Sequence, residues 1–404
     1  MKRAGARLRV VVTGLVAQHP CLGGVTWDYL QFPLGLAKLG HDVYYLEDSG
    51  EWPYTLDGGP SGTEWVARDP TPNVSHLARV MERFGLGERW AYRFPTAPRW
   101  FGLSEARRRE VTDSADLILD VSGSLEDPER HRGRGRLVYL DTDPVFTQIK
   151  LAVGKPAFRA RVAAHDLHFS FGERVGALPF ATGFRWRPTR QPVVLEEWRA
   201  GAATRDVYST VMSWTSYPPL VFEGESFGQK DVEFQRFLDL PRRIAPMALE
   251  VAVGATRHVD WESAVGAVSP HEVLRRAGWR VADAYQVGAD LDAYRDYVVS
   301  SRGEWSVQKH GYVRGQAGWF SCRSACYLAA GRPVVVQDTG LAGLLPLGEG
   351  LLAFSDREGA AAALREVDAN YPRHAAAARA LAGEYFDSRR VLTALLEEAL
   401  ASDA

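Results

Sequence analysis

The segment at residues 318–340 combines a cationic side chain with the start of a predicted helix, an arrangement suited to binding an anion. Ser321 stands where a helix N-cap is expected, and residues 322–330 contain no helix breaker. Arg323 therefore falls in the first turn, at the positive end of the helix dipole. Its planar guanidinium could pair with two oxygens of a phosphate. A surface arginine is the alternative interpretation.

A buried parallel strand is predicted directly after this helix. Gly331 ends the helix, and the residues Pro-Val-Val-Val that follow are apolar enough to be covered on both faces. Asp338, Thr339 and Gly340 close the unit at the carboxyl end of that strand. Open α/β sheets bind their ligands at this edge, so the helix start and the turn should face one crevice.

A second group of reactive side chains lies near the amino terminus. His19 precedes the Gly23-Gly24 pair in a loop after the first predicted strand, and Asp28 follows early in the next helix. A histidine or carboxylate there could act as a general base. The two glycines would let the backbone approach a phosphate closely. A simple turn and a non-catalytic histidine are the alternatives.

The order of these features resembles a known family. A small residue, Arg323, a helix, Ala-x-Gly-x-Pro-Val-Val and a Thr-Gly turn are similar to the nucleotide-sugar half of GT-B glycosyltransferases. The group-1 type and its spore-coat-like relatives are the most similar. The resemblance implies an α/β protein of GT-B type, with two Rossmann-like domains facing a central cleft and the donor held mainly by the second. An unrelated α/β ligand-binding protein with a similar turn is the alternative.

The resemblance also implies which cations reach the donor diphosphate. Arg323 is one of them. Lys230 stands where group-1 relatives carry a phosphate-binding lysine, although Asp231 replaces the glycine that follows it there. Lys309 ends a predicted strand at the same edge of the sheet and either joins them or lies in a solvated loop.

Other residues of the segment have weaker assignments. Trp319 would stack on a base or sugar, or fill the core, and Ser321 would donate to a phosphate or only cap the helix. The Thr339-Gly340 turn resembles the one that contacts sugar or phosphate through backbone N–H groups. Asp338 would accept hydrogen bonds from sugar hydroxyls, or cap the turn.

The sequence departs from the family at two positions. Many retaining group-1 enzymes carry two glutamates eight residues apart around this motif, and here Gly318 and Cys326 occupy those positions. How the ribose and the sugar are held, and whether the sugar's configuration is retained, are therefore open. Loss of activity is an alternative.

Asp141 and Asp143 form an Asp-x-Asp pair, which in other folds binds a divalent ion and a nucleotide diphosphate. Here the pair ends a strand of the first predicted domain, away from the donor motif. We therefore predict no metal site, and consider an acceptor or interdomain contact instead.

Length and composition restrict the remaining possibilities. A chain of 404 residues usually forms two domains, and the net charge of −2 gives no reason to expect a nucleic-acid partner. Three cysteines without a framework favour a cytoplasmic protein with reduced thiols. No apolar stretch approaches the roughly 20 residues that span a membrane.

Alternating strands and helices divide the chain. We expect an acceptor-side Rossmann-like domain at residues 1–200 and a nucleotide-sugar domain at 206–385. A final helix at 386–404 would pack back on the first domain, as in the family. Leu-Gly-His before the second strand is typical of bacterial members.

The resemblance predicts a metal-independent hexosyltransferase. It would use a nucleotide-diphosphate sugar as donor, no separate cofactor, and a small molecule or glycan as acceptor. A non-catalytic binding or partner protein is one alternative. A nucleotide-sugar epimerase or hydrolase on the same scaffold is another.

Overall fold

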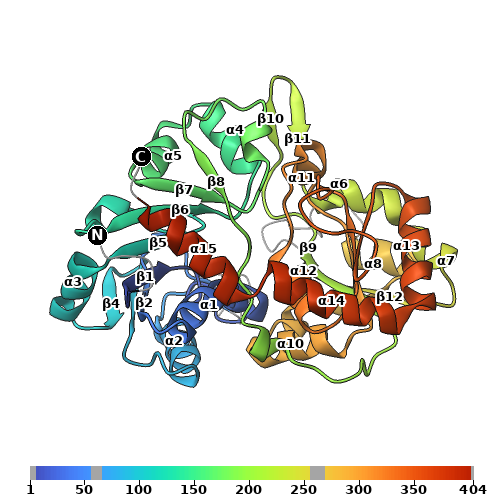
Figure 1. Cartoon of the computed structure of the whole chain (residues 1–404), viewed down its shortest axis with the longest axis horizontal. Coiled ribbons are helices and arrows are strands. Elements are labelled where there is room, and N and C mark those ends of the chain that lie inside the picture. Colours follow the sequence, from blue (N-terminus) through green and yellow to red (C-terminus); the bar gives the residue numbers. More distant parts are fainter. Residues whose placement is uncertain (1–5, 56–65, 255–268, 402–404) are drawn as a thin grey trace.

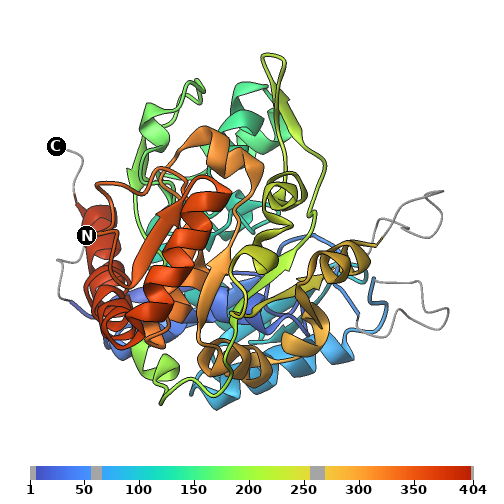
Figure 2. The same cartoon turned by 90° about the vertical axis from the view of Figure 1, so that its right-hand side faces the viewer.

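The computed structural model describes residues 6–55, 66–254 and 269–401, which form two α/β domains lying side by side (Figure 1). Each domain is built on a mostly parallel sheet. Figure 2, seen from the second domain, shows helices on both sides of that domain's sheet. In the described part of the chain, no helix is long and apolar enough to cross a membrane.

The first sheet has the order β4-β3-β2-β1-β5-β6-β7-β8 and is parallel except for the β3–β4 pair. Its central strands are buried along nearly their whole length, which is why they consist of apolar runs such as Leu-Ile-Leu-Asp-Val. The strands are β1 Arg9–Thr13, β2 Asp42–Glu47, β3 Trp90–Phe94, β4 Arg99–Gly102, β5 Leu117–Val121, β6 Arg136–Asp141, β7 Leu167–Ser170 and β8 Trp186–Pro188. The helices are α1 Gly23–Lys38, α2 Thr71–Arg83, α3 Glu105–Ser114, α4 Phe146–Ala152 and α5 Pro156–Ala163.

The second sheet has the order β13-β12-β9-β14-β15-β16 and is parallel throughout. Its strands are β9 Tyr208–Ser213, β12 Leu249–Gly254, β13 Arg280–Asp283, β14 Gly303–Ser306, β15 Val334–Gln337 and β16 Leu351–Phe354. Its helices are α6 Lys230–Phe234, α7 Leu240–Arg243, α8 Pro270–Ala277, α9 Ala284–Val287, α10 Leu291–Ser300, α11 His310–Gly315, α12 Cys322–Ala329 and α13 Arg357–Ala369. A hairpin of β10 Leu220–Phe222 and β11 Glu225–Phe227 projects from this domain (Figure 1).

The chain returns to the first domain at its end. Helix α14 (Tyr371–Tyr385) packs on α12, and α15 (Ser388–Leu400) then runs along α1 (Figure 1). Leu392, Leu395 and Leu396 belong to the same buried cluster as Val10 and Val12 of β1. The first domain is therefore built from both ends of the described chain.

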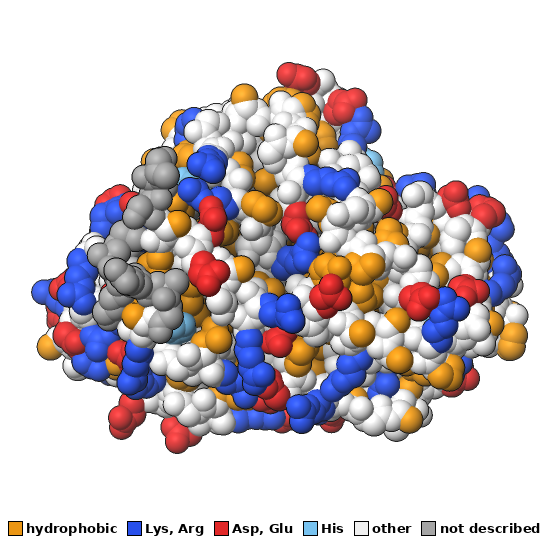
Figure 3. All heavy atoms as spheres, viewed as in Figure 1, with side chains coloured by type: hydrophobic (Ala, Val, Ile, Leu, Met, Phe, Trp, Pro, Cys, Tyr) orange, Lys and Arg blue, Asp and Glu red, His pale blue; other side chains and the backbone are white. Residues whose placement is uncertain are grey.

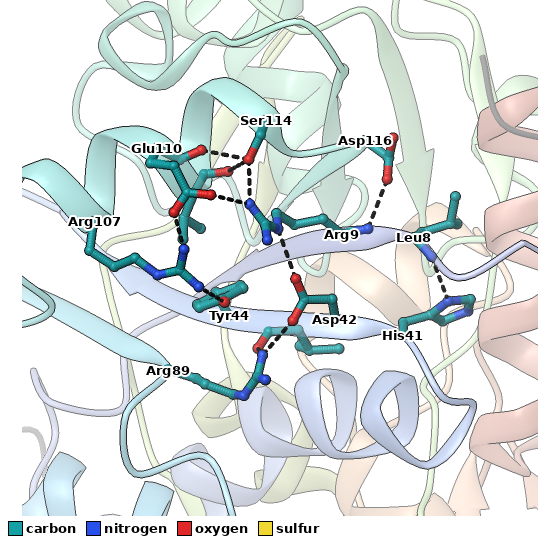
Figure 4. A network of polar contacts seen from close by, with 12 residues as sticks. Leu8, Arg9, His41, Asp42, Tyr44, Arg89, Arg107, Glu110, Ser114 and Asp116 are labelled. Carbon is teal, nitrogen blue, oxygen red and sulfur yellow. Dashed lines mark hydrogen bonds and ion pairs between the residues drawn. The ribbon is translucent and has the colours of Figure 1, made fainter.

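A polar network ties the first sheet together at the amino ends of its strands (Figure 4). The Arg9 guanidinium donates to Asp42 at 2.8 Å and to Glu110 at 2.6 Å, and Arg89 donates to the other Asp42 oxygen at 2.5 Å. Strands β1 and β2 point away from this network, so it lies at the edge opposite their carboxyl ends.

Two segments differ from their predicted form. A strand and its exit loop are predicted over residues 304–312, but the strand ends at Ser306 and helix α11 begins at His310. The sequence of residues 232–240 predicts a single helix, but the structure has α6, a 3₁₀ turn and α7 in this region. Phe234, Phe237 and Leu240 are all buried in one core, and their spacing of three suits a 3₁₀ turn better than an α-helix.

Candidate functional site

A cavity of about 480 Å³ lies between the two domains, at the carboxyl ends of strands from both sheets. The loop after β1, helix α1 and the ends of β5 and β6 form one side. The end of β9, the loop before α6 and the start of α12 form the other. Eight predicted site residues line the cavity: His19, Gly24, Asp28, Lys230, Lys309, Trp319, Ser321 and Arg323. The other four do not: Gly23, Asp338, Thr339 and Gly340.

Arg323 lies in the first turn of α12, as predicted, but most of its guanidinium is bound within its own domain. Its Nε donates to Glu304 at 2.6 Å, and its two Nη groups donate to the Val211 carbonyl at 2.8 Å and to Ser306 at 2.7 Å. An arginine has five N–H groups, so two remain for a ligand. The charge is already balanced, because Glu304 is completely buried against it.

Glu304 holds Arg323 in place and was not among the residues predicted from the sequence. The signal was available, because a carboxylate inside the buried strand β14 needs a cationic partner. What the sequence does not show is that this partner is Arg323, nineteen residues further along the chain.

Lys230 lines this cavity and differs from Arg323 and Lys309 in having no ion-pair partner among the described residues. It begins α6, and no described residue forms a hydrogen bond or ion pair with its ammonium. Burial lowers the pKa of Lys230 well below its usual value, and repulsion from Arg323 and Lys309 lowers it further. A bound anion would reverse these effects, so this position suits a negatively charged ligand.

Lys309 is held across the domain boundary. Its ammonium lies 2.8 Å from Asp143 of the first domain, and the Tyr217 hydroxyl donates to the same carboxylate at 2.6 Å. Tyr312 also donates to Asp143. Burial alone would raise the pKa of Asp143, but these partners, Lys309 foremost, lower it. Asp143 thus forms the interdomain contact that was one interpretation of the Asp-x-Asp pair.

Asp141, the other member of that pair, turns into its own domain. It accepts hydrogen bonds from Thr147 at 2.7 Å, Gln148 at 2.9 Å and Ser170 at 2.8 Å. The two carboxylates therefore have separate partners. Among the residues that the structure describes, no group of three or more His, Cys, Asp or Glu side chains could hold a metal ion.

The turn after β15 forms a hydrogen bond with the segment that precedes α12. Asp338 accepts from the N–H groups of Gly340 and Leu341, both at 3.0 Å, and the Thr339 hydroxyl donates to the Trp319 carbonyl at 2.5 Å. Gly340 has a φ of 91°, which favours glycine. The Gly340 N–H, one of the two predicted to contact sugar or phosphate, is thus bonded to Asp338, and the donor role of the Thr339-Gly340 turn stays a prediction.

Trp319 and Ser321 both face the cavity. The indole of Trp319 stacks on Tyr312 with ring centroids 4.2 Å apart, and its N–H donates to the Thr142 carbonyl at 3.3 Å. Ser321 occupies the N-cap position, but its side chain makes no capping hydrogen bond. Its hydroxyl is therefore available to a ligand at the start of α12.

Asp28 projects from α1 toward the start of α12. Its carboxylate is exposed to the cavity, but the protein around the cavity displaces much of the bulk water. This desolvation raises the pKa of Asp28 to about 7. The charge of Arg323 and a hydrogen bond from Cys322 oppose the rise. A carboxylate with such a pKa can exchange protons near neutral pH.

His19 is less suited to the same task. Burial lowers its pKa to about 4, so the imidazole is neutral at pH 7. Its ring stacks on Tyr54 at 4.8 Å. His19 and Asp28 both line the first-domain side of the cavity. Of these two predicted bases, Asp28 has the pKa closer to neutral pH and is therefore better suited to accept a proton.

The two glycines have different environments. A Cβ on Gly23 would lie 2.0 Å from the Asp290 carbonyl oxygen, and the Gly23 N–H donates to the Gly288 carbonyl at 2.7 Å. Gly23 therefore permits a close contact between the domains. Gly24 lines the cavity beside the Tyr294 ring, and a Cβ there would lie 2.9 Å from that ring.

The two positions where the family glutamates are absent lie outside the cavity lining. Gly318 has a φ of 72°, and Cys326 is buried in the core, where the Gln31 amide donates to its sulfur at 3.6 Å. Both positions are therefore used for packing and backbone geometry.

Comparison with known proteins extends the description of the fold. No family model matches the sequence, and no curated protein does. The structure is similar to that of AviGT4, a glycosyltransferase involved in avilamycin A biosynthesis, at 16% identity, a TM-score of 0.52 and coverage of 97% of each chain. It is also similar to HepE from Anabaena in complex with UDP-glucose, at 13% identity, a TM-score of 0.58 and coverage of 98% of this chain and 100% of that one. An α-glucosyltransferase bound to UDP and a 13-mer DNA gives 11% identity, the same TM-score and the same coverage.

The chain has the GT-B fold. The predicted fold class is confirmed, because two Rossmann-like sheets face one another as in these glycosyltransferases. The boundaries predicted for the domains, and the roles of individual site residues, stay predictions.

Proposed function

We propose that the protein transfers a sugar from a nucleotide-diphosphate donor to an acceptor hydroxyl in the cavity between its domains. The observation that carries this proposal is Lys230, a cation at the carboxyl edge of the second sheet that has no bonded partner among the described residues. The neighbours HepE and the α-glucosyltransferase were both solved with UDP or UDP-glucose, which supports a diphosphate at this position.

In the proposed reaction the acceptor O–H gives its proton to the Asp28 carboxylate, and the oxygen attacks the anomeric carbon. The bond from that carbon to the diphosphate oxygen breaks, and its electron pair leaves with the nucleoside diphosphate. Lys230, the two remaining N–H groups of Arg323 and the start of α12 would stabilise the leaving charge. With Asp28 as base, the displacement would invert the anomeric centre. The proposed sugar is a hexose, and the proposed mechanism uses no metal.

One observation favours a second candidate, a non-catalytic nucleotide-binding protein of the same fold. Of the three cations among the described lining residues, two are already neutralised, Arg323 by Glu304 and Lys309 by Asp143. A nucleotide would then bind mainly through Lys230, and no transfer would follow.

The experiment is calorimetric titration with UDP, ADP and GDP, followed by release of the diphosphate from the matching sugar nucleotide. We expect Lys230→Ala to weaken binding roughly 10- to 100-fold, because a hydrogen bond to a charged group contributes about 1.5–3 kcal/mol. Lys155→Ala, at an exposed lysine outside the cavity, is the control.

Each outcome has a definite meaning. If no diphosphate binds, or if Lys230→Ala and Lys155→Ala bind equally well, the donor site is not here. Binding without release of diphosphate supports the non-catalytic candidate. Release that needs an acceptor indicates transfer, and release without one indicates a hydrolase.

A further inference from the structure

The two halves of the cavity carry unequal charge. Among the described lining residues, every cation belongs to the second domain: Lys230, Lys309 and Arg323. The first-domain half contributes one charged side chain, Asp28, together with His19, which is neutral at pH 7 because burial lowers its pKa to about 4. A diphosphate is therefore favoured on the second-domain side of the cavity only. On the first-domain side, no described cation lines the cavity to bind an anion.

The wall on the first-domain side is apolar. Leu15, Leu22 and Val25 are half-buried and line the cavity, and the indole of Trp319 adjoins them from the second domain. Side chains of the first domain's core complete the wall behind them: Tyr29, Phe32, Val121 and Phe171. Burying a flat apolar ring against such a wall is favourable, because it removes apolar surface from water.

The hydroxyl groups on this wall are already bonded to one another. Tyr29 donates to Ser122 at 3.0 Å, and the Ser122 and Thr142 hydroxyls share a hydrogen bond of 2.7 Å. A sugar ring placed here would bring several hydroxyls out of water and meet few free partners, which is costly. A ligand with a single hydroxyl needs only one partner, and Asp28 can supply it.

We propose that the first-domain half of the cavity binds an uncharged aromatic acceptor, with its ring against Leu15, Val25 and Trp319 and its hydroxyl at Asp28. This inference rests on the proposed function, since it names the acceptor class of that reaction. It excludes sugars and anionic metabolites as the preferred acceptors.

The test is calorimetric titration of the full-length protein, with and without saturating UDP. The ligands are 2-naphthol, its anionic relative 6-hydroxy-2-naphthoate, and glucose. We expect 2-naphthol to bind at least tenfold more tightly than either of the others. The naphthoate carries the same ring and hydroxyl, so its weaker binding would isolate the effect of charge.

A variant pair locates the binding. Leu15→Lys places a cation on the apolar wall and should weaken 2-naphthol at least tenfold while strengthening the naphthoate. Val153→Lys makes the same kind of change at an exposed apolar residue outside the cavity and should alter neither affinity. Val25→Ser provides a milder second variant if Leu15→Lys unfolds, as judged by circular dichroism.

The two proposals fail in different ways. If UDP, ADP and GDP all fail to bind, the proposed function is wrong. If a diphosphate binds but glucose or the naphthoate binds as tightly as 2-naphthol, only the acceptor inference is wrong. The same conclusion follows if neither Leu15→Lys nor Val25→Ser changes the affinity for 2-naphthol.

Discussion

Asp28 is the residue whose chemistry is most directly tested by substitution. If it takes the acceptor proton, Asp28→Asn should lower kcat by about 10²- to 10⁴-fold, the usual range for a positioned base. Nucleotide affinity should stay within a few fold, because Asp28 lies on the other domain from Lys230. Steady-state kinetics and titration with the diphosphate check both expectations, and His19→Gln is the matched variant at the less suited base.

The pH dependence has a definite sign. Asp28 must be ionised to accept a proton, and its pKa is raised to about 7, so kcat should increase as pH rises through that value. A rate that falls over this range would mean that Asp28 acts in its protonated form or not at all.

The sequence predicts which element carries a charged site residue better than it predicts the residue that pairs with that charge. Arg323 was placed correctly in the first turn of a helix at the cavity, because caps, breakers and glycines are local signals. Its pairing with Glu304, and that of Lys309 with Asp143, depend on the packing of distant segments. These pairings decide which cations remain available, and no local pattern encodes them.

At the scale of elements, the network around Arg9 and Asp42 joins β1, β2 and α3 away from the cavity (Figure 4). Asp42→Asn should lower the free energy of unfolding by about 1 kcal/mol, since Asp42 and its partners are only partly exposed. Denaturant unfolding measures this, and Asp113→Asn on the exposed surface is the control. Nucleotide binding should be unaffected by either substitution.

This contribution should depend on pH. Burial alone would raise the pKa of Asp42, but hydrogen bonds from Arg89 and Arg9 outweigh it and lower the pKa below its ordinary value. The stabilisation is thus complete above the ordinary aspartate pKa and is lost as pH falls through the lowered one. A difference between wild type and Asp42→Asn that persists in strong acid would contradict this origin.

Most strands were predictable because a parallel strand covered on both faces must be a short apolar run bounded by turns. The strand at residues 334–337 and the glycine that follows its helix are examples. Helix α11 was missed because His310–Gly315 is short and contains two glycines, and its burial comes from packing on the first domain. The prediction of one helix over the α6–α7 region was wrong, because the spacing of its apolar residues fits both an α-helix and a 3₁₀ turn.

At the scale of the whole molecule, the contact of Lys309 with Asp143 is more buried than a second ion pair between described residues of the two domains, Arg83 with Asp292. The side chains of Lys309 and Asp143 are 18% and 28% exposed, against 44% and 59% for Arg83 and Asp292. Asp143→Asn should therefore loosen the domains and increase the radius of gyration measured by small-angle X-ray scattering. Asp292→Asn should have little effect, as exposed pairs contribute about 0–1 kcal/mol.

If Asp292→Asn increased the radius of gyration more than Asp143→Asn, the contact of Lys309 with Asp143 would not be the one that holds the domains together. On the face seen in Figure 3, Lys and Arg side chains are interspersed with Asp and Glu side chains. This mixing accords with the net charge of −2.

The return of α15 to the first domain has a consequence for biosynthesis. Five residues of this helix complete the core around β1: Leu392, Leu395, Leu396, Ala399 and Leu400. During translation the amino-terminal domain emerges first, but its apolar surface along α1 stays uncovered until the last helix leaves the ribosome. If the first sheet forms before α15 is synthesised, the flank along α1 is exposed at that stage, and an exposed apolar surface of this kind is what chaperones bind.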